Sequence, residues 1–190
     1  MSHAFPSTVL NRLQLRAFRP GDIGEVYAAL SHPQVIAHYG VSYPDLASTA
    51  EQMRWFEQIQ AQGTGLWWAI TERERDVVIG ACGFNDWSHA HRHAHLGYWL
   101  MPEHWRKGLL SEALPWILQY AFDHLQIHRV HADVEPENTA SCALLRKVGF
   151  QLEGTLRDVE IKDGRFLSLH QYSLLASDPA AQRYRDPMKG

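Results

Sequence analysis

The chain has few cysteines and no long hydrophobic run, and both features limit the classes of protein to which it can belong. Its two cysteines, Cys82 and Cys142, have no metal-like spacing, so we expect reduced thiols and a cytoplasmic location. No stretch reaches the roughly 18 uninterrupted apolar residues that a membrane helix needs. Residues 1–10 also lack the charged start and apolar core of a signal peptide. We therefore expect no membrane partner.

Positive charge is not in excess either. Lysine and arginine number 18 against 21 acidic residues, which gives a net charge of -3. Nucleic-acid-binding domains usually carry a basic excess, so we expect no nucleic-acid partner. A length of 190 residues suits one well-buried core. We predict a single domain over residues 1–190, with its core at about 13–176 and a loose tail over 177–190.

Hydrophobic periodicity predicts strands first and then strands that alternate with helices. The expected strands are 13–18, 66–71, 77–84, 96–101, 129–134, 150–158 and 166–175. The expected helices are 22–30, 46–62, about 107–123 and 138–149. Residues 31–44 are expected to form an aromatic loop and 85–93 a polar link. Asp22 with Glu25 resembles a capping box, and Asp163-Gly164 is a strong hairpin turn signal. The predicted class is α/β with one mixed sheet.

Residues 96–123 combine a strand, a basic turn and the start of a helix. Such a turn leaves backbone N–H groups unpaired at the helix start. These groups and the positive end of the helix dipole form an anion site. Arg106 and Lys107 add positive charge, and Gly108 allows the backbone to approach a phosphate. The stretch therefore predicts a site for a phosphate-bearing ligand.

Two segments, GYWLMPEHWRKGLLSEAL and NTASCALLRKVGF, resemble the GCN5-related N-acetyltransferase (GNAT) superfamily in its ribosomal-protein N-acetyltransferase (RimJ/RimL-like) branch. The resemblance extends from Leu13 to about Leu175. It implies the acyl-CoA N-acyltransferase fold, with a mostly antiparallel mixed sheet splayed at its centre and flanked by helices. It also implies acetyl-CoA as co-substrate. The acceptor would be an amine, either a protein N-terminal α-amine or a small molecule, attacking directly in a ternary complex.

The resemblance also assigns the residues that would hold the coenzyme. The family motif is Gln/Arg-x-x-Gly-x-Gly/Ala, and this chain departs from it at the first and last positions. The Leu100 or Met101 N–H would polarise the thioester carbonyl. Arg106 and Lys107 either contact phosphate or only solvate the loop. The predicted phosphate-binding residues are Trp105, Arg106, Lys107, Gly108, Leu109 and Leu110.

The helix after Asn138 supplies the candidate proton donor. Many family members protonate the thiolate with a tyrosine at the position of Leu145, which cannot do so. Ser141, one turn earlier, is the candidate here, and Asn138 would contact the coenzyme arm or fix a water. The alternative is that Asn138 is only an N-cap and Ser141 a first-turn polar residue. Cys142 points about 100° away from Ser141 and is interpreted as a packing residue.

The general base is poorly defined by the sequence. Glu135 and His95 are both candidates, and a water relay is the alternative. A row of histidines at every second position would share one strand face and could bind zinc or nickel. No carboxylate or cysteine completes a ligand set nearby, so we expect no metal. The row consists of His89, His91, His93 and His95.

The acceptor is expected to enter between loop 32–45 and hairpin 157–168. That loop has only one acidic residue, Asp45, which favours a neutral or peptide-like amine over a polycation. The rival interpretation is a regulatory or sensor protein that binds acyl-CoA without transferring its acyl group. The sequence leaves open the acceptor, the base and the oligomeric state, a homodimer included.

Overall fold

The computed structural model describes residues 5–184. The strands are β1 (Thr8–Val9), β2 (Leu13–Arg16), β3 (Leu66–Glu72), β4 (Val78–Ser88), β5 (His93–Leu100), β6 (Arg129–Val134), β7 (Gln151–Lys162) and β8 (Arg165–Leu175). The helices are α1 (Ile23–Leu30), α2 (Pro33–Ile36), α3 (Leu46–Gln62), α4 (Leu109–Asp123), α5 (Thr139–Lys147) and α6 (Pro179–Gln182), with 3₁₀ turns η1 (Pro20–Asp22) and η2 (Pro102–His104).

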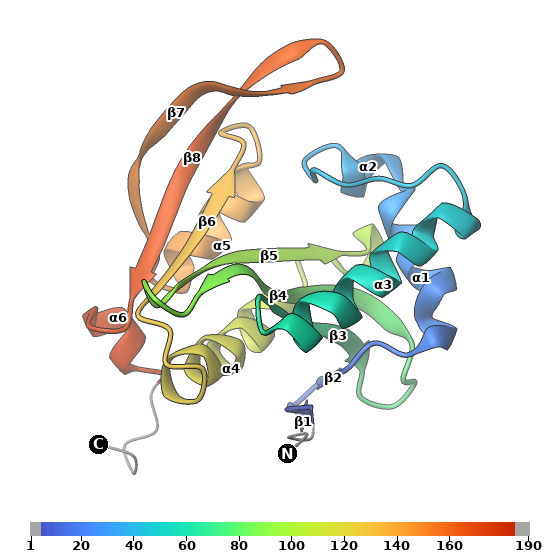
Figure 1. Cartoon of the computed structure of the whole chain (residues 1–190), viewed down its shortest axis with the longest axis horizontal. Helices are drawn as coiled ribbons and strands as arrows, with labels where there is room; N and C mark the ends of the chain where they lie inside the picture. The colour runs from blue at the N-terminus through green and yellow to red at the C-terminus, as the bar shows by residue number, and fades with distance from the viewer. Residues whose placement is uncertain (1–4, 185–190) are drawn as a thin grey trace. The chain divides into compact units, whose positions relative to one another are not determined.

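The eight strands form one sheet in the order β1-β2-β3-β4-β5-β6-β8-β7 (Figure 1). β5 and β6 run parallel, whereas β1–β2, β2–β3, β3–β4, β6–β8 and β7–β8 run antiparallel. The predicted mixed, mostly antiparallel sheet is therefore confirmed. The parallel ladder ends at the pair His95–His131 while β6 continues to Val134, which is the early end expected where a sheet splays.

The chain divides into two compact units within the described residues. The first consists of 5–87 and 97–113, and the second of 88–96 and 114–184. The single domain predicted over 1–190 stays a prediction. Among residues 5–184, no helix has the length and apolar character that crossing a membrane requires.

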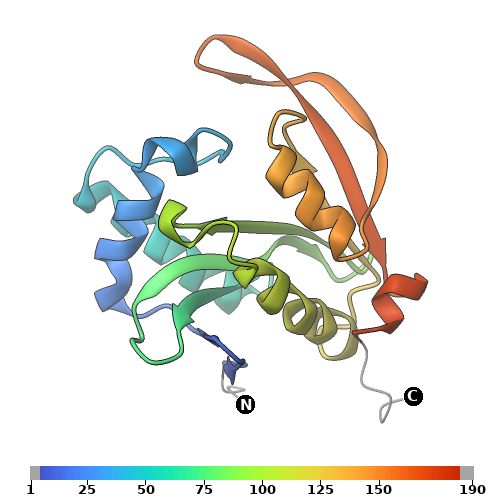
Figure 2. The same cartoon turned by 180° about the vertical axis from the view of Figure 1, so that it is seen from behind.

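The core of the first unit lies between its helices and its strands. Figures 1 and 2 show α3 across one face of β3 and β4. α3 begins at Asp45, whose carboxylate accepts the Ser48 N–H at 2.7 Å, and ends at Gly63 with a φ of 67°. The buried apolar residues of this core are Val26, Ala29, Leu30, Val35, Phe56, Ile59, Trp67, Ala69, Val78, Ala81 and Trp99.

The predicted capping box at Asp22 is wrong. Asp22 lies in η1, and its carboxylate accepts hydrogen bonds from the Arg16 guanidinium and from the Arg19 N–H. The buried cation of Arg16 takes the carboxylate, so α1 begins at Ile23 without a side-chain cap. The aromatic loop also contains a short helix, α2, which the prediction lacked.

The second unit is built on β6, β7 and β8. β6 covers the predicted range 129–134, and its burial alternates, with Val130, Ala132 and Val134 buried. Figure 1 shows the β7–β8 hairpin as a long ribbon that extends beyond β6 and α5. Its turn has positive φ at Asp163 (51°) and Gly164 (75°), the geometry of a type I′ turn, so the predicted Asp-Gly turn is confirmed.

Two boundaries differ from the prediction. The polar link predicted over 85–93 is shortened to 89–92, because β4 continues to Ser88 and β5 already begins at His93. The predicted loose tail contains α6, whose Ala181 is fully buried, and the Tyr184 hydroxyl donates to the Val148 carbonyl at 3.0 Å. This short segment has no hydrophobic periodicity from which its burial could be predicted.

Candidate active site

The predicted phosphate turn lies between the end of β5 and the start of α4. β5 ends at Leu100, η2 follows, and α4 begins at Leu109. The Trp105 indole N–H donates to the Leu100 carbonyl at 2.6 Å. Trp105 therefore ties the turn back to its own strand from the position where the family motif has Gln or Arg.

The backbone of this turn is left-handed at two residues. φ is 58° at Arg106 and 73° at Gly108, a conformation that costs most residues about 1–2 kcal/mol and glycine very little. Arg106, Lys107 and Gly108 are all exposed. Among the described residues, a Cβ on Gly108 would meet one atom within 4 Å, the Nη2 of Arg12 at 3.8 Å. The backbone is thus open to an approaching phosphate, and this geometry fits a coenzyme diphosphate.

The first two residues of α4 differ in what they can offer a ligand. The Leu109 side chain is buried and that of Leu110 is half-buried. Leu109 can therefore contact a phosphate only through its backbone N–H, one of the unpaired donors at the helix start. We expect Leu110 to contact a phosphate through its backbone N–H as well.

Arg12, which the sequence analysis did not identify, holds this turn. Its backbone N–H and its Nε donate to the two carboxylate oxygens of Glu112 at 2.8 and 2.7 Å, and its Nη1 donates to the Lys107 carbonyl at 2.8 Å. Burial alone would raise the pKa of Glu112, but the hydrogen bonds from Arg12 hold that pKa below its ordinary value. Arg12 and Glu112 are 100 positions apart, so no local pattern could have linked them.

Only one of the two predicted thioester-polarising N–H groups is open. The Met101 N–H donates to the Ile79 carbonyl of β4 at 2.9 Å, so it is already engaged. Successive N–H groups of a strand point to alternate edges, and the N–H of Leu100 therefore points away from β4. Leu100 is the better candidate of the pair.

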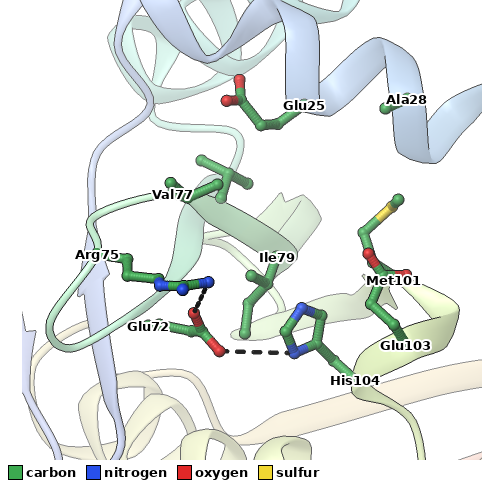
Figure 3. Close-up of a pocket in the computed structure, with 10 residues that line it drawn as sticks. Glu25, Ala28, Glu72, Arg75, Val77, Ile79, Met101, Glu103 and His104 are labelled. Carbon is green, nitrogen blue, oxygen red and sulfur yellow. Dashed lines mark ion pairs between the residues drawn. The ribbon is translucent and has the colours of Figure 1, made fainter.

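A cavity of about 420 Å³ lies beside Met101 in the first unit (Figure 3). α1 contributes Glu25 to its lining, and η2 contributes Glu103. Glu72 lies within 4.0 Å of the Arg75 guanidinium and 3.9 Å of the His104 ring. None of the predicted catalytic residues lines this cavity.

In the second unit, α5 places Asn138 and Ser141 together. The Asn138 side-chain oxygen accepts the Ser141 N–H at 3.1 Å, so Asn138 is the N-cap of α5. Ser141 is half-buried in the first turn, and its hydroxyl is not needed for the cap. The cap uses only the oxygen of Asn138, which leaves its amide nitrogen as a donor.

Two further side chains of α5 are buried, and the predicted packing role of Cys142 is confirmed. Leu145 is fully buried, and Cys142 is 4% exposed. Both side chains belong to the core of the second unit. Cys142 is therefore a packing residue, out of reach of a substrate.

The two candidate bases are each near another charged or ionisable group. Glu135 lies 3.9 Å from the Lys162 ammonium and is only 13% exposed. His95 Nε2 lies 3.8 Å from a carboxylate oxygen of Asp133. The His95 ring stacks on that of His131, with 5.0 Å between their centroids. Each candidate is thus held by a neighbour from its own unit.

The four histidines do not form a row on one strand face. His89 and His91 lie in the turn before β5, and only His93 and His95 are in the strand. The neighbouring strand β6 adds His131, paired in register with His95. Stacked rings direct their nitrogens outward from their edges and not toward one common point. Within residues 5–184, no group of three or more histidine, cysteine or acidic side chains is placed to hold a metal ion.

His131 is expected to make stability depend on pH. Burial, with smaller effects of His95, Arg129 and His93 that outweigh the opposing effect of Asp133, lowers its pKa from 6.5 to about 4. The unfolded chain therefore binds a proton between pH 6.5 and 4 that the folded chain does not, so stability falls as the pH falls through this window. We expect a loss of about 1 kcal/mol, less than the full shift because water screens the half-buried ring.

The measurement is urea unfolding at pH 7 and at pH 5. His131→Gln should reduce the difference between the free energies of unfolding at pH 7 and pH 5. His128→Gln, which removes an exposed histidine, should leave that difference unchanged. An unchanged pH dependence in His131→Gln would assign the effect to other groups. Arg129 and Ser173 lower the pKa of Glu153 to about 2, so Glu153 makes stability depend on pH only below about pH 4.5.

Comparison with known proteins tests the predicted family. A family model described as acetyltransferase (GNAT) domain matches residues 12–151. The chain is 35% identical over 170 residues to the uncharacterized N-acetyltransferase p20 of Bacillus licheniformis, covering 89% of this chain and 96% of that one. It is 30% identical over 110 residues, 57% of either chain, to the ribosomal protein uS5-alanine N-acetyltransferase of Escherichia coli strain K12.

The solved structures agree with the sequence relatives. RimJ of Mycobacterium smegmatis, in complex with CoA-disulfide, has a TM-score of 0.81 and 25% identity, covering 93% of this chain and 91% of that one. The predicted resemblance is confirmed over most of the chain: the protein belongs to the GNAT acetyltransferase family and is an N-acetyltransferase.

Proposed function

We propose that the protein transfers the acetyl group of acetyl-CoA to the α-amine of a peptide, which attacks directly in a ternary complex. The open phosphate turn carries the coenzyme part of this proposal. Its backbone is left-handed at Gly108, exposed, and free of any crowding atom where a side chain would stand. The RimJ structure with CoA-disulfide supports the same coenzyme.

The first unit binds and polarises the coenzyme in this proposal. Bound acetyl-CoA supplies an activated acetyl thioester. The Leu100 N–H, which points away from β4, donates to the thioester carbonyl and stabilises the charge that develops on its oxygen. The backbone at Gly108 and the start of α4 hold the diphosphate, with Arg106 and Lys107 as exposed cations beside it.

The second unit supplies the proton chemistry. The Ser141 hydroxyl passes a proton to the departing thiolate and regains one, directly or through water, from the group that accepts the amine proton. The Asn138 amide contacts the coenzyme arm or fixes a water. Glu135, His95 or a water held by them accepts the proton of the amine. The buried Cys142 offers no accessible thiol for a covalent route, which supports direct attack.

A peptide acceptor fits the charges of loop 32–45. Its only acidic residue is Asp45, and that carboxylate is already engaged as the N-cap of α3. The loop thus has no spare carboxylate for a polycationic amine. The Escherichia coli relative is named for an alanine of a ribosomal protein, which supports a protein α-amine.

The test is coenzyme A thiol release with acetyl-CoA and a panel of peptides, polyamines and aminoglycosides. We expect release with peptides that carry a free α-amine and none with the same peptides after N-terminal blocking. Release with polyamines or aminoglycosides alone would show that the acceptor is a small-molecule amine and not a peptide. Coenzyme binding without release across the panel would favour an acyl-CoA sensor.

Gly108→Ala is expected to weaken coenzyme A binding by about tenfold or more. The added methyl group stands where the diphosphate would approach, and the left-handed backbone costs about 1 kcal/mol of stability in addition. Isothermal titration calorimetry measures the affinity, and urea unfolding measures the stability.

Gly164→Ala is the matched control, because Gly164 also has a positive φ of 75° and no atom within 4 Å of its Cβ position. It should lose similar stability and no affinity. Equal coenzyme affinities in wild type and Gly108→Ala would remove the turn from the binding site.

A further inference from the structure

Arg12 has one donor group left after it has tied the turn together. Its backbone N–H, Nε and Nη1 are engaged by Glu112 and by the Lys107 carbonyl. Its Nη2 has no hydrogen-bond partner within residues 5–184, and it is the only atom within 4 Å of the Cβ position of Gly108. The arginine side chain is 47% exposed, so a ligand can reach it.

We propose that Arg12 is a phosphate-contacting residue, whose Nη2 donates to the diphosphate of the coenzyme beside Gly108. This inference rests on the proposed function of the turn. Guanidinium groups bind phosphate oxygens well because their N–H donors are fixed in one plane. Within residues 5–184, no hydrogen bond holds the side chain of Arg106 or Lys107, which are exposed in the turn itself.

The hydrogen bonds to Glu112 and to the Lys107 carbonyl make Arg12 more suitable for this role than a mobile surface cation. Two hydrogen bonds, from Nε to Glu112 and from Nη1 to the Lys107 carbonyl, hold the guanidinium, so little further side-chain entropy is lost when a ligand binds. The same contact also affects Glu112. A carboxylate in the first turn of α4 interacts favourably with the helix dipole but would repel a phosphate. Arg12 neutralises that carboxylate and directs its remaining donor to the ligand side.

Two other roles of Arg12 must be distinguished from phosphate contact. Arg12 could serve only to neutralise Glu112, in which case removing both charges would restore binding. It could also serve only to keep the turn folded, in which case every part of the coenzyme would bind less well. The experiment therefore needs a double variant and a ligand without phosphate.

The measurement is isothermal titration calorimetry of wild type, Arg12→Gln, Glu112→Gln and the double variant with coenzyme A and with pantetheine. Arg12→Gln should bind coenzyme A roughly 10- to 100-fold more weakly, the range for hydrogen bonds to a charged group. Its affinity for pantetheine, which has no phosphate, should equal that of wild type. The double variant should stay at least about tenfold weaker for coenzyme A.

Arg73→Gln is the charge control, because Arg73 is exposed and lies in the neighbouring hairpin turn; it should bind coenzyme A as wild type does. Wild-type affinity in the double variant, or an equal loss for pantetheine, would overturn the inference. If Arg12→Gln does not fold, Arg12→Lys carries the same comparison with the charge kept and the planar fork removed. A wild-type protein that binds no coenzyme A would instead overturn the proposed function.

Discussion

Ser141→Ala is expected to lower kcat by about 100-fold while the affinity for acetyl-CoA changes by less than about twofold. General acid catalysis contributes roughly 10²–10⁴-fold, and a weakly acidic hydroxyl belongs at the low end of that range. The substitution removes only the hydroxyl. The Ser141 N–H still donates to Asn138, so the start of α5 is preserved.

Thr139→Ala provides the control for this prediction. Thr139 is exposed at the first position of α5, so its loss tests whether any hydroxyl at the start of the helix matters. Steady-state kinetics with a saturating peptide acceptor should show a normal kcat for Thr139→Ala. An unchanged kcat in Ser141→Ala would remove Ser141 from the mechanism, and an equal fall in both would indicate a disturbed helix.

Features determined by nearby residues were predictable from the sequence. The alternation of β6, the Asp163-Gly164 turn and the buried Leu145 all follow from periodicity or turn chemistry within a few residues. The phosphate turn belongs to the same group, since Gly108 and its basic neighbours are adjacent in the chain. The same holds for the cap formed by Asn138.

Features that depend on pairing between distant segments were not predictable. The register that places His131 beside His95 depends on the pairing of β5 with β6, which are far apart in the sequence. The engagement of the Met101 N–H depends on its contact with Ile79. Likewise, Arg12 joins the site only because β2 brings it to α4.

Asp22→Asn is expected to lower the free energy of unfolding by about 3 kcal/mol, the low end of the range for breaking a buried ion pair. Arg16 is 3% exposed and Asp22 is 7% exposed. Two guanidinium N–H groups donate to the carboxylate at 2.8 and 2.9 Å. An asparagine would turn one N–H₂ group toward these donors and leave the cation of Arg16 less compensated.

Urea unfolding at pH 7 should show a lower midpoint with an unchanged m value, and the melting temperature should fall by about 6–12 °C. Glu74→Gln, which removes an exposed carboxylate from the nearby hairpin, should stay within about 0.5 kcal/mol of wild type. A loss below about 1 kcal/mol in Asp22→Asn would mean that Asp76, 2.6 Å from the Arg16 Nε, compensates the cation by itself.

Replacing both partners separates the ion pair from the rest of its network. In Arg16→Met with Asp22→Leu, no buried cation remains, and Asp76 keeps its bond to the Arg19 guanidinium at 2.6 Å. The Arg19 N–H, however, loses the Asp22 oxygen that accepts it at 2.7 Å. We therefore expect the double variant to recover most of the loss but to stay about 1 kcal/mol below wild type, the cost of one unsatisfied backbone donor. Stability at or above that of wild type would show that this N–H finds water or another acceptor once the carboxylate is gone.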